Sequence, residues 1–204
     1  MIIKLKEIAE ITNGYAFRKK IEPSSDGTVS VVQMKDLTEN NTIDLNNAII
    51  VEDEGFKKHH ILRKGDLVFR TRGQIFNSAI LETEPENIVT LSGPLLKIRI
   101  TEPEKILPEY INSYISLNKT QAYIMSRVKN SSLSGMITKN AVEEIEIIIP
   151  SIEKQKSIIQ IDKLIRQEQI LMKELIDKKE RLYKHILNNY ISDTHSLKGE
   201  NNGR

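Results

Sequence analysis

The sequence predicts an α+β fold, in which a mixed α/β domain is followed by a long C-terminal coiled-coil helix. The boundary lies at residues 142–149, an isoleucine-rich alternating segment typical of a strand, and at Pro150, which cannot continue a strand ladder. Ser151 then provides a helix N-cap. Residues 152–191 contain neither glycine nor proline, which predicts one uninterrupted helix of about 60 Å.

Apolar side chains recur along this helix at alternating spacings of four and three residues, as the a and d positions of a heptad repeat do. We expect the apolar seam positions to form a dimerisation surface: Ile161, Ile165, Met172, Leu175, Leu182 and Ile186. Glu168 and Lys179 occupy the remaining seam positions, and such polar residues can fix register and partner number. Leu164 and Leu171 widen the stripe. The alternative is a surface helix that packs on its own domain, although a helix of this length would extend beyond a domain of about 150 residues.

The residues before this helix combine short β-branched segments with a few helical ones. The expected strands cover residues 28–33, 67–69, 79–81, 88–91, 95–100 and 142–149. The expected helices cover residues 5–12, 54–60, a stretch that begins at Pro108, and 120–128, whereas residues 129–139 form a polar loop. After the long helix, the polar residues 192–204 predict a flexible tail.

Composition narrows the class of protein. The chain contains no cysteine, which excludes disulfides, thiolate metal sites and a cysteine nucleophile and suits a reducing cytoplasm. No apolar run approaches the ~20 residues of a membrane span, and the N-terminus lacks the apolar core of a signal peptide. The formal net charge is only +2, and residues 1–150 are slightly net negative. A DNA-binding prediction therefore needs local clustering of basic residues.

Motifs for catalysis are missing. The sequence has no phosphate-binding glycine loop, dinucleotide loop or methyl-donor loop. His59 and His60 are adjacent, so their side chains diverge on a helix or a strand and are poorly placed to share a metal. Carboxylates gather at residues 52–54, 82–86 and 143–146, but none of these groups shows the separated acids and lysine of a metal-dependent nuclease. We therefore expect no cofactor, no metal site and no catalytic residues.

The positive signal is local basic clustering. Residues 57–72 carry six lysines and arginines against the single acid Asp66. A second cluster covers residues 18–20, and a third flanks the loop at 129–139. Such clusters offer contacts to DNA phosphates, whereas bases are read by forked or amide side chains. The expected DNA-binding residues are Arg18, Lys19, Lys20, Gln33, Lys35, Arg70, Arg72, Gln74, Asn77, Lys129, Asn130, Ser131 and Ser132.

The order of four segments resembles the target recognition domain of the specificity subunits of Type I restriction-modification systems. These segments are KLKEIAEI with NGYAF at 4–17, VVQMKDL at 31–37, RKGDLVF at 63–69 and IEIIIPSIEKQ at 145–155. The third looks like the family's Lys-Gly-Asp strand entry, and the fourth resembles its strand, prolines, Glu-Gln pair and long helix. Ser151 stands where a second proline is common, and Lys154 stands where an acid is common.

The resemblance implies a non-catalytic module with a DNA target recognition domain at 1–150, a dimerisation helix at 151–191 and a tail at 192–204. Full-length members resemble two such units in tandem, and this chain carries one. The implied protein is thus a half-subunit that reads one half of a bipartite site. Its implied partners are double-stranded DNA, a second copy of itself, DNA methyltransferase subunits and the restriction subunit, in the cytoplasm and without a membrane.

Two other classes of function stay open on the sequence alone. The acidic groups leave room for a small metal-dependent nuclease. The long helix leaves room for a coiled-coil adaptor, in which the basic clusters would have no role. Metal-dependent cleavage by the purified chain would indicate the first alternative. A monomer without salt-dependent DNA affinity would indicate the second.

Overall fold

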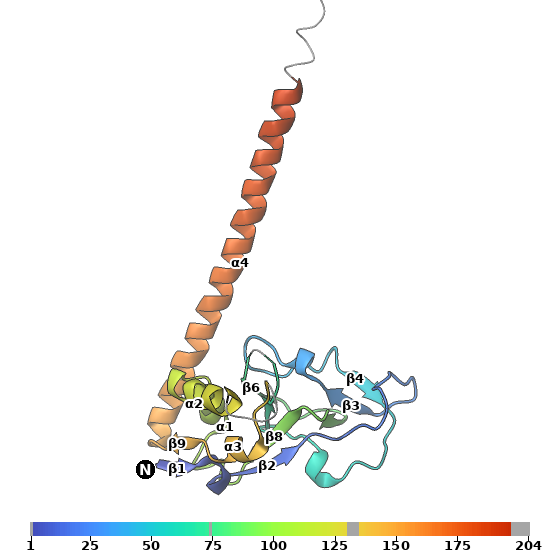
Figure 1. Cartoon of the computed structure of the whole chain (residues 1–204), viewed down its shortest axis with the longest axis vertical. Helices are drawn as coiled ribbons and strands as arrows, with labels where there is room; N and C mark the ends of the chain where they lie inside the picture. The colour runs from blue at the N-terminus through green and yellow to red at the C-terminus, as the bar shows by residue number, and fades with distance from the viewer. Residues whose placement is uncertain (1, 74, 130–134, 197–204) are drawn as a thin grey trace, which may run out of the picture. The chain divides into compact units, whose positions relative to one another are not determined.

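The computed structural model describes residues 2–73, 75–129 and 135–196 (Figure 1). Its strands are β1 Ile2–Lys4, β2 Ala9–Asn13, β3 Val29–Val32, β4 Ile49–Val51, β5 Leu67–Arg70, β6 Ser78–Ile80, β7 Ile88–Leu91, β8 Leu95–Ile100 and β9 Glu146–Ile148. Its α-helices are α1 Pro108–Ile115, α2 Asn118–Lys129, α3 Lys139–Glu143 and α4 Ile152–Ser196. Packing divides the chain into two compact units, one ending at Ile161 and the other beginning at Asp162.

The strands of the first unit form three sheets. The largest has the order β2-β8-β5-β6 with antiparallel neighbours throughout. A smaller sheet has the order β4-β3-β7, in which β3 is antiparallel to β4 and parallel to β7. Strands β1 and β9 form an antiparallel pair that joins the start of the chain to the segment before α4. Figure 1 shows β3 and β4 at the end of this unit away from α1 and α2.

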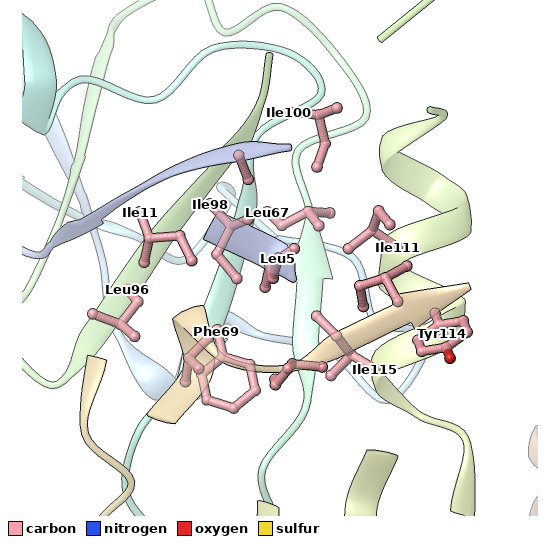
Figure 2. Close-up of a cluster of buried hydrophobic side chains, with 14 of the residues drawn as sticks. Leu5, Ile11, Leu67, Phe69, Leu96, Ile98, Ile100, Ile111, Tyr114 and Ile115 are labelled. Atoms are coloured by element: carbon pink, nitrogen blue, oxygen red, sulfur yellow. The ribbon is translucent and has the colours of Figure 1, made fainter. Parts of the chain in front are cut away.

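The inner strand β5 of the four-stranded sheet is buried on both faces, as the alternation of its side chains shows. Leu67 and Phe69 belong to the larger apolar core, together with residues of α1 (Figure 2). Val68, between them, belongs to a second core that includes residues of β3 and β7. Successive side chains of a strand point to opposite faces, so β5 and its neighbours separate the two cores. The near-continuous apolar run at 67–69 is the sequence signature of this double burial.

Helix α1 follows from its sequence. Pro108 occupies one of its first two positions, where its fixed φ favours a helix and its missing N–H is not needed. Ile111, Tyr114 and Ile115 then fall on one face and are buried against the sheet (Figure 2). Burial of each such side chain contributes about 1.5–3 kcal/mol.

The turn before β5 depends on Asp66, whose residue is only 2% exposed. Its Oδ2 accepts a hydrogen bond of 2.8 Å from the backbone N–H of Arg63. Its two oxygens also accept bonds of 2.7 and 2.6 Å from the Arg99 guanidinium on β8. Gly65 has a φ of 86°, which glycine adopts without steric cost. The Lys-Gly-Asp segment therefore forms a turn that is stabilised by the ion pair of Asp66 with Arg99 on β8.

The beginning of α4 is fixed to the first unit by Gln155, which is fully buried. Its Oε1 accepts from the backbone N–H of Leu107 at 2.9 Å. Its Nε2 donates to the carbonyl oxygens of Lys105 and Pro150, each at 3.0 Å. Ser151 caps the same helix, since its Oγ accepts from the N–H of Lys154 at 3.5 Å.

Within the described residues, no helix combines the length and the apolar character needed to cross a membrane.

Most predicted strands are confirmed, but the helix predicted at 5–12 is wrong. A short 3₁₀ turn at Leu5–Glu7 is followed by β2, in which buried Ala9 and Ile11 alternate with exposed Glu10. The spacing of the apolar residues fits either structure over so short a stretch. Pairing with β8, far along the chain, favours the strand.

Three further boundaries differ from the prediction. The segment at 54–60 is helical only in the 3₁₀ turn Lys58–His60. The strand predicted at 142–149 is confirmed only at 146–148, because α3 covers residues 139–143 and Thr138 caps it by accepting from the N–H of Ala141. Helix α4 continues to Ser196, past the expected end at Ile191 and into the segment predicted to be a flexible tail. The rest of that tail and residues 130–134 of the predicted loop lie outside the described residues.

Replacing the buried Gln155 by alanine is expected to lower the free energy of unfolding by about 3 kcal/mol, because three backbone groups lose their partner. Gln160→Ala is the matched control, since Gln160 lies on the same helix with its side chain exposed. Chemical denaturation measures both variants. Equal stabilities for the two variants would contradict the assigned role of Gln155.

The ion pairs of Glu144 predict a pH dependence. Lys4 and Lys6 each place Nζ 2.5 Å from a Glu144 carboxylate oxygen, and these hydrogen bonds lower the pKa of Glu144 from 4.5 to about 2. A lowered pKa stabilises the fold above the unfolded value and stops doing so as the pH falls through the folded value. The stability difference between wild type and Glu144→Gln should thus be greatest above pH 4.5 and vanish by about pH 2. A difference that is constant over this range, measured by urea denaturation, would refute the assignment.

Candidate nucleic-acid interface

The segment between β5 and β6 is a loop whose two ends are held by hydrogen bonds. At its start, Thr71 donates through Oγ1 to the carbonyl of Pro94 at 2.8 Å and accepts at its own carbonyl from Ile137 N–H at 2.9 Å. At its end, the carbonyl of Phe76 accepts from Gln121 Nε2 at 2.9 Å, and the Phe76 ring is buried. Fixed ends favour a defined position for Arg72 and Ile75.

Arg72 and Ile75 are the described side chains that this loop presents to solvent. Arg72 is exposed, forms an isolated antiparallel bridge with Met136, and places Nη2 3.3 Å from the Met136 sulfur, a weak acceptor. Ile75 is 62% exposed. A forked guanidinium suits a guanine edge, and an apolar side chain suits a thymine methyl group. The loop therefore displays two of the kinds of group that can read bases in the major groove.

Arg70, which sequence reasoning grouped with Arg72, makes internal contacts instead. Its Nη2 donates to the carbonyl oxygens of Met34 and Leu37 at 2.6 and 2.9 Å. Burial lowers the pKa of this guanidinium below its usual value. In this structure Arg70 holds the turn at 34–36 against β5. Its role is therefore to position that turn.

That turn carries two more predicted residues, Gln33 and Lys35. The backbone N–H of Gln33 donates to Asp36 Oδ2 at 2.8 Å, and its side chain is half-buried. Burial raises the pKa of Asp36. Lys35 is exposed, with Nζ 3.3 Å from the carbonyl oxygen of Asn47. Arg70 binds this turn and lies at the end of β5, directly before the loop that carries Arg72. The turn with Gln33 and Lys35 is therefore held beside the end of β5.

Asn77 also serves the fold in this structure. Its Nδ2 donates to Oδ1 of Asn41 at 2.9 Å, and Asn112 Nδ2 donates to the Asn41 carbonyl at 3.0 Å. Asn41 is buried with a φ of 56°, a conformation that asparagine tolerates better than most residues. Sequence reasoning missed Asn41, although adjacent asparagines at 40 and 41 are a turn signal.

The second basic region lies around Arg18. Arg18, Lys19 and Lys20 are exposed, and Arg18 lines a shallow pocket of about 600 Å³. Basic groups at the same pocket are His59, His60 and Lys139, which the sequence did not connect with Arg18. The pocket could accept a phosphate group, because its charged lining is basic.

Buried Lys97 supports one wall of this pocket. Its Nζ donates to the carbonyl oxygens of His59 and Ile61 at 2.5 and 3.3 Å. Burial lowers the pKa of Lys97, and burial is also the main cause of the lowered pKa of His60. Lys97 thus holds the turn at His59 and His60 against β8. Sequence reasoning placed Lys97 in a strand but gave it no role.

Other predicted residues cannot be placed. Gln74, Asn130, Ser131 and Ser132 lie outside the described residues. Lys129 ends α2, but its side chain also lies outside what is described. The predicted DNA-contacting residues therefore stay predictions, and two groups of exposed candidates can be located: Lys35 and Arg72 in one, and residues 18–20 in the other.

Helix α4 carries a wide apolar stripe. The six predicted seam side chains are 41–57% exposed within the chain. Further exposed apolar residues widen the stripe: Leu164, Leu171, Ile176, Tyr183, Leu187, Tyr190 and Ile191. Such a continuous exposed apolar surface is typical of an interface with another molecule.

The chain belongs to the family of Type I restriction modification DNA specificity domains, whose pattern it matches over residues 1–181. The family assignment and the α+β fold expected from the sequence are thereby confirmed. The match includes the β-sheet unit and most of α4.

Solved structures from Type I restriction-modification systems share this fold. One, described as the structural basis of complex assembly and conformational transition of the type I R-M system, has a TM-score of 0.67 at 14% identity and aligns with 91% of this chain and 43% of its own. The HsdS subunit from Thermoanaerobacter tengcongensis has a TM-score of 0.58 at 15% identity, over 86% and 39% of the two chains. The S subunit from M. genitalium has a TM-score of 0.56 at 16% identity, over 92% and 44%. The chain thus spans about two fifths of each.

Stability should separate the two arginines of the β5 strand and loop. Arg70→Ala is expected to lower the free energy of unfolding by about 2 kcal/mol, because two carbonyl groups lose a charged donor. Arg72→Ala is expected to change it by less than about 0.5 kcal/mol, because Arg72 is exposed. Urea denaturation of both variants measures the difference, and equal losses would contradict these assignments.

Proposed function

We propose that this protein is a DNA-specificity module that reads one half of a bipartite site and dimerises through α4. The observation that carries this proposal is the match of residues 1–181 to the DNA specificity domain family. The solved S subunits are more than twice as long as the aligned region, which supports a functional unit built from two such modules. The wide apolar stripe of α4 supports self-association as the way of joining them.

The reading surface in this proposal is the β5–β6 loop with the adjoining turn at 34–36. Arg72 supplies a forked donor at an exposed position. Arg70 holds the two segments together through its hydrogen bonds to the carbonyl oxygens of Met34 and Leu37. The residues at 18–20 and the pocket beside them bind phosphates, which orient the duplex without reading its sequence. Base readers and phosphate contacts are thereby assigned to different parts of the unit.

The module itself is proposed to be non-catalytic. DNA methyltransferase subunits and the restriction subunit would be recruited to it in the cytoplasm and would carry the chemistry. Within the described residues, no group of three or more histidines or carboxylates is arranged to hold a metal ion. Cleavage of DNA by the purified chain with Mg²⁺ would favour the nuclease alternative and count against this proposal.

Selection from a pool of randomised duplexes tests the reading function, because the target sequence need not be known. Wild type is expected to enrich a defined half-site. Arg72→Ala should lose about 1–3 kcal/mol of discrimination at one base pair. Arg18→Gln should weaken binding to all sequences alike and reduce the slope of log affinity against log salt by about one.

Lys178→Ala on α4 is the matched control for charge loss outside the proposed reading surface, and it should leave the selected sequence unchanged. Fluorescence anisotropy at several salt concentrations provides the affinities. If wild type enriches no sequence, alone or with methyltransferase subunits present, the proposed function is wrong. If Arg72→Ala and Lys178→Ala behave alike, the assigned reading surface is wrong.

A further inference from the structure

Two charged side chains interrupt the apolar stripe of α4. The residues three and four positions from Glu168 are all apolar: Leu164, Ile165, Leu171 and Met172. The same holds for Lys179, with Leu175, Ile176, Leu182 and Tyr183. These are the positions that supply ion-pair partners within a helix. Covering the stripe would therefore remove water from two charges that have no opposite charge beside them on their own helix.

The seam is symmetric about the point between Lys173 and Glu174. Pairing positions that lie equally far on either side of this point matches every seam residue with another seam residue. The pairs are Ile161 with Ile186, Ile165 with Leu182, Met172 with Leu175, and Glu168 with Lys179. Apolar residues meet apolar residues, and the acid meets the base.

We propose that α4 pairs antiparallel with a second copy in this register, so that Glu168 of each copy forms an ion pair with Lys179 of the other. The inference rests on the self-association in the proposed function and specifies its geometry. The arrangement has two-fold symmetry, in which each contact occurs twice. It supplies both isolated charges with a partner as the stripe is covered.

Other arrangements leave the charges unsatisfied. A parallel pair in register places Glu168 against Glu168 and Lys179 against Lys179. An antiparallel pair shifted by one heptad places Glu168 against Ile186 or against Met172, depending on the direction of the shift. A like-charge contact or a buried unpaired charge disfavours each of these. The two charged residues therefore select one direction and one register, as polar seam residues can.

The register has a geometric consequence. Ile161 of one copy lies beside Ile186 of the other, so the two Ile161 residues are separated by about 38 Å along the helix axis at 1.5 Å per residue. One turn of a DNA duplex spans about 34–36 Å. The charged pair thus sets the spacing between the points where the two first units end.

Charge reversal in the full chain tests the pairing. Each single variant, Glu168→Lys or Lys179→Glu, should raise the dimer Kd at least about tenfold, because two like-charge contacts replace two ion pairs. The double variant should restore the Kd to within about threefold of wild type, because it exchanges the charges. Matched controls on the same helix but outside the seam are Glu174→Lys and Lys184→Glu, which should change it by less than about threefold. Sedimentation equilibrium measures all five variants, and thermal unfolding checks that each is folded.

Cross-linking provides a second readout, because the chain has no cysteine of its own. A mixture of Ile165→Cys and Leu182→Cys chains should form a disulfide-linked dimer on mild oxidation, whereas neither chain should link to itself. Self-linkage of each single variant would indicate parallel helices and overturn the proposal. Single charge reversals without effect, or a double variant that does not recover, would overturn it as well.

These outcomes are separable from those of the DNA selection. A wild-type chain that enriches a sequence but dimerises independently of the two charges would disprove the register and leave the reading function intact. A chain that dimerises with the expected charge dependence but enriches no DNA would support the register and disprove the reading function.

Discussion

The ion pair between buried Asp66 and half-buried Arg99 is the interaction on which the turn before β5 depends. It joins the turn before β5 to β8, and β8 is paired with β2 on its other side. Leaving the buried Asp66 carboxylate without its partner would be costly, since a buried unpaired charge destabilises by about 3–5 kcal/mol. The same carboxylate also accepts from the backbone of Arg63. These contacts fix the turn from which β5 begins, and the loop with Arg72 follows at the other end of that strand.

Positive charges of the first unit serve different roles. Lys97, Arg99 and Arg70 are turned inward, where carbonyl oxygens or a carboxylate satisfy them. Arg72 and the residues at 18–20 are turned to solvent. Exposed basic side chains are available to a nucleic acid and those engaged inside the fold are not, so neither the total charge nor the density of basic residues along the chain measures the binding surface. This explains how residues 1–150, which are slightly net negative, can still offer basic surfaces.

The secondary structure was predictable wherever a local signal was strong, as at Pro108 and in the apolar run at 67–69. It was not predictable at 5–12, because the apolar spacing fits a helix and a strand equally and pairing with distant β8 decided between them. The candidate site shows the same division. Arg72 was predicted from its cluster and is exposed, whereas Arg70 and Asn77, from the same segment, are occupied by contacts with residues 34, 37 and 41.

By itself the sequence determined strand β3, strands β5 to β8, helices α1 and α2, the turn at 63–66, the uninterrupted helix after Pro150 and the resemblance to the specificity subunits, because these depend on nearby residues and their periodicity. Only the tertiary structure decided which polar side chains are structural. It showed that Gln155 fastens α4 and that His59, Lys139 and Arg18 share one pocket. The physical reason is that a side chain's role depends on the partners within a few ångströms of it, and those partners come from segments whose separation along the chain carries no local signal.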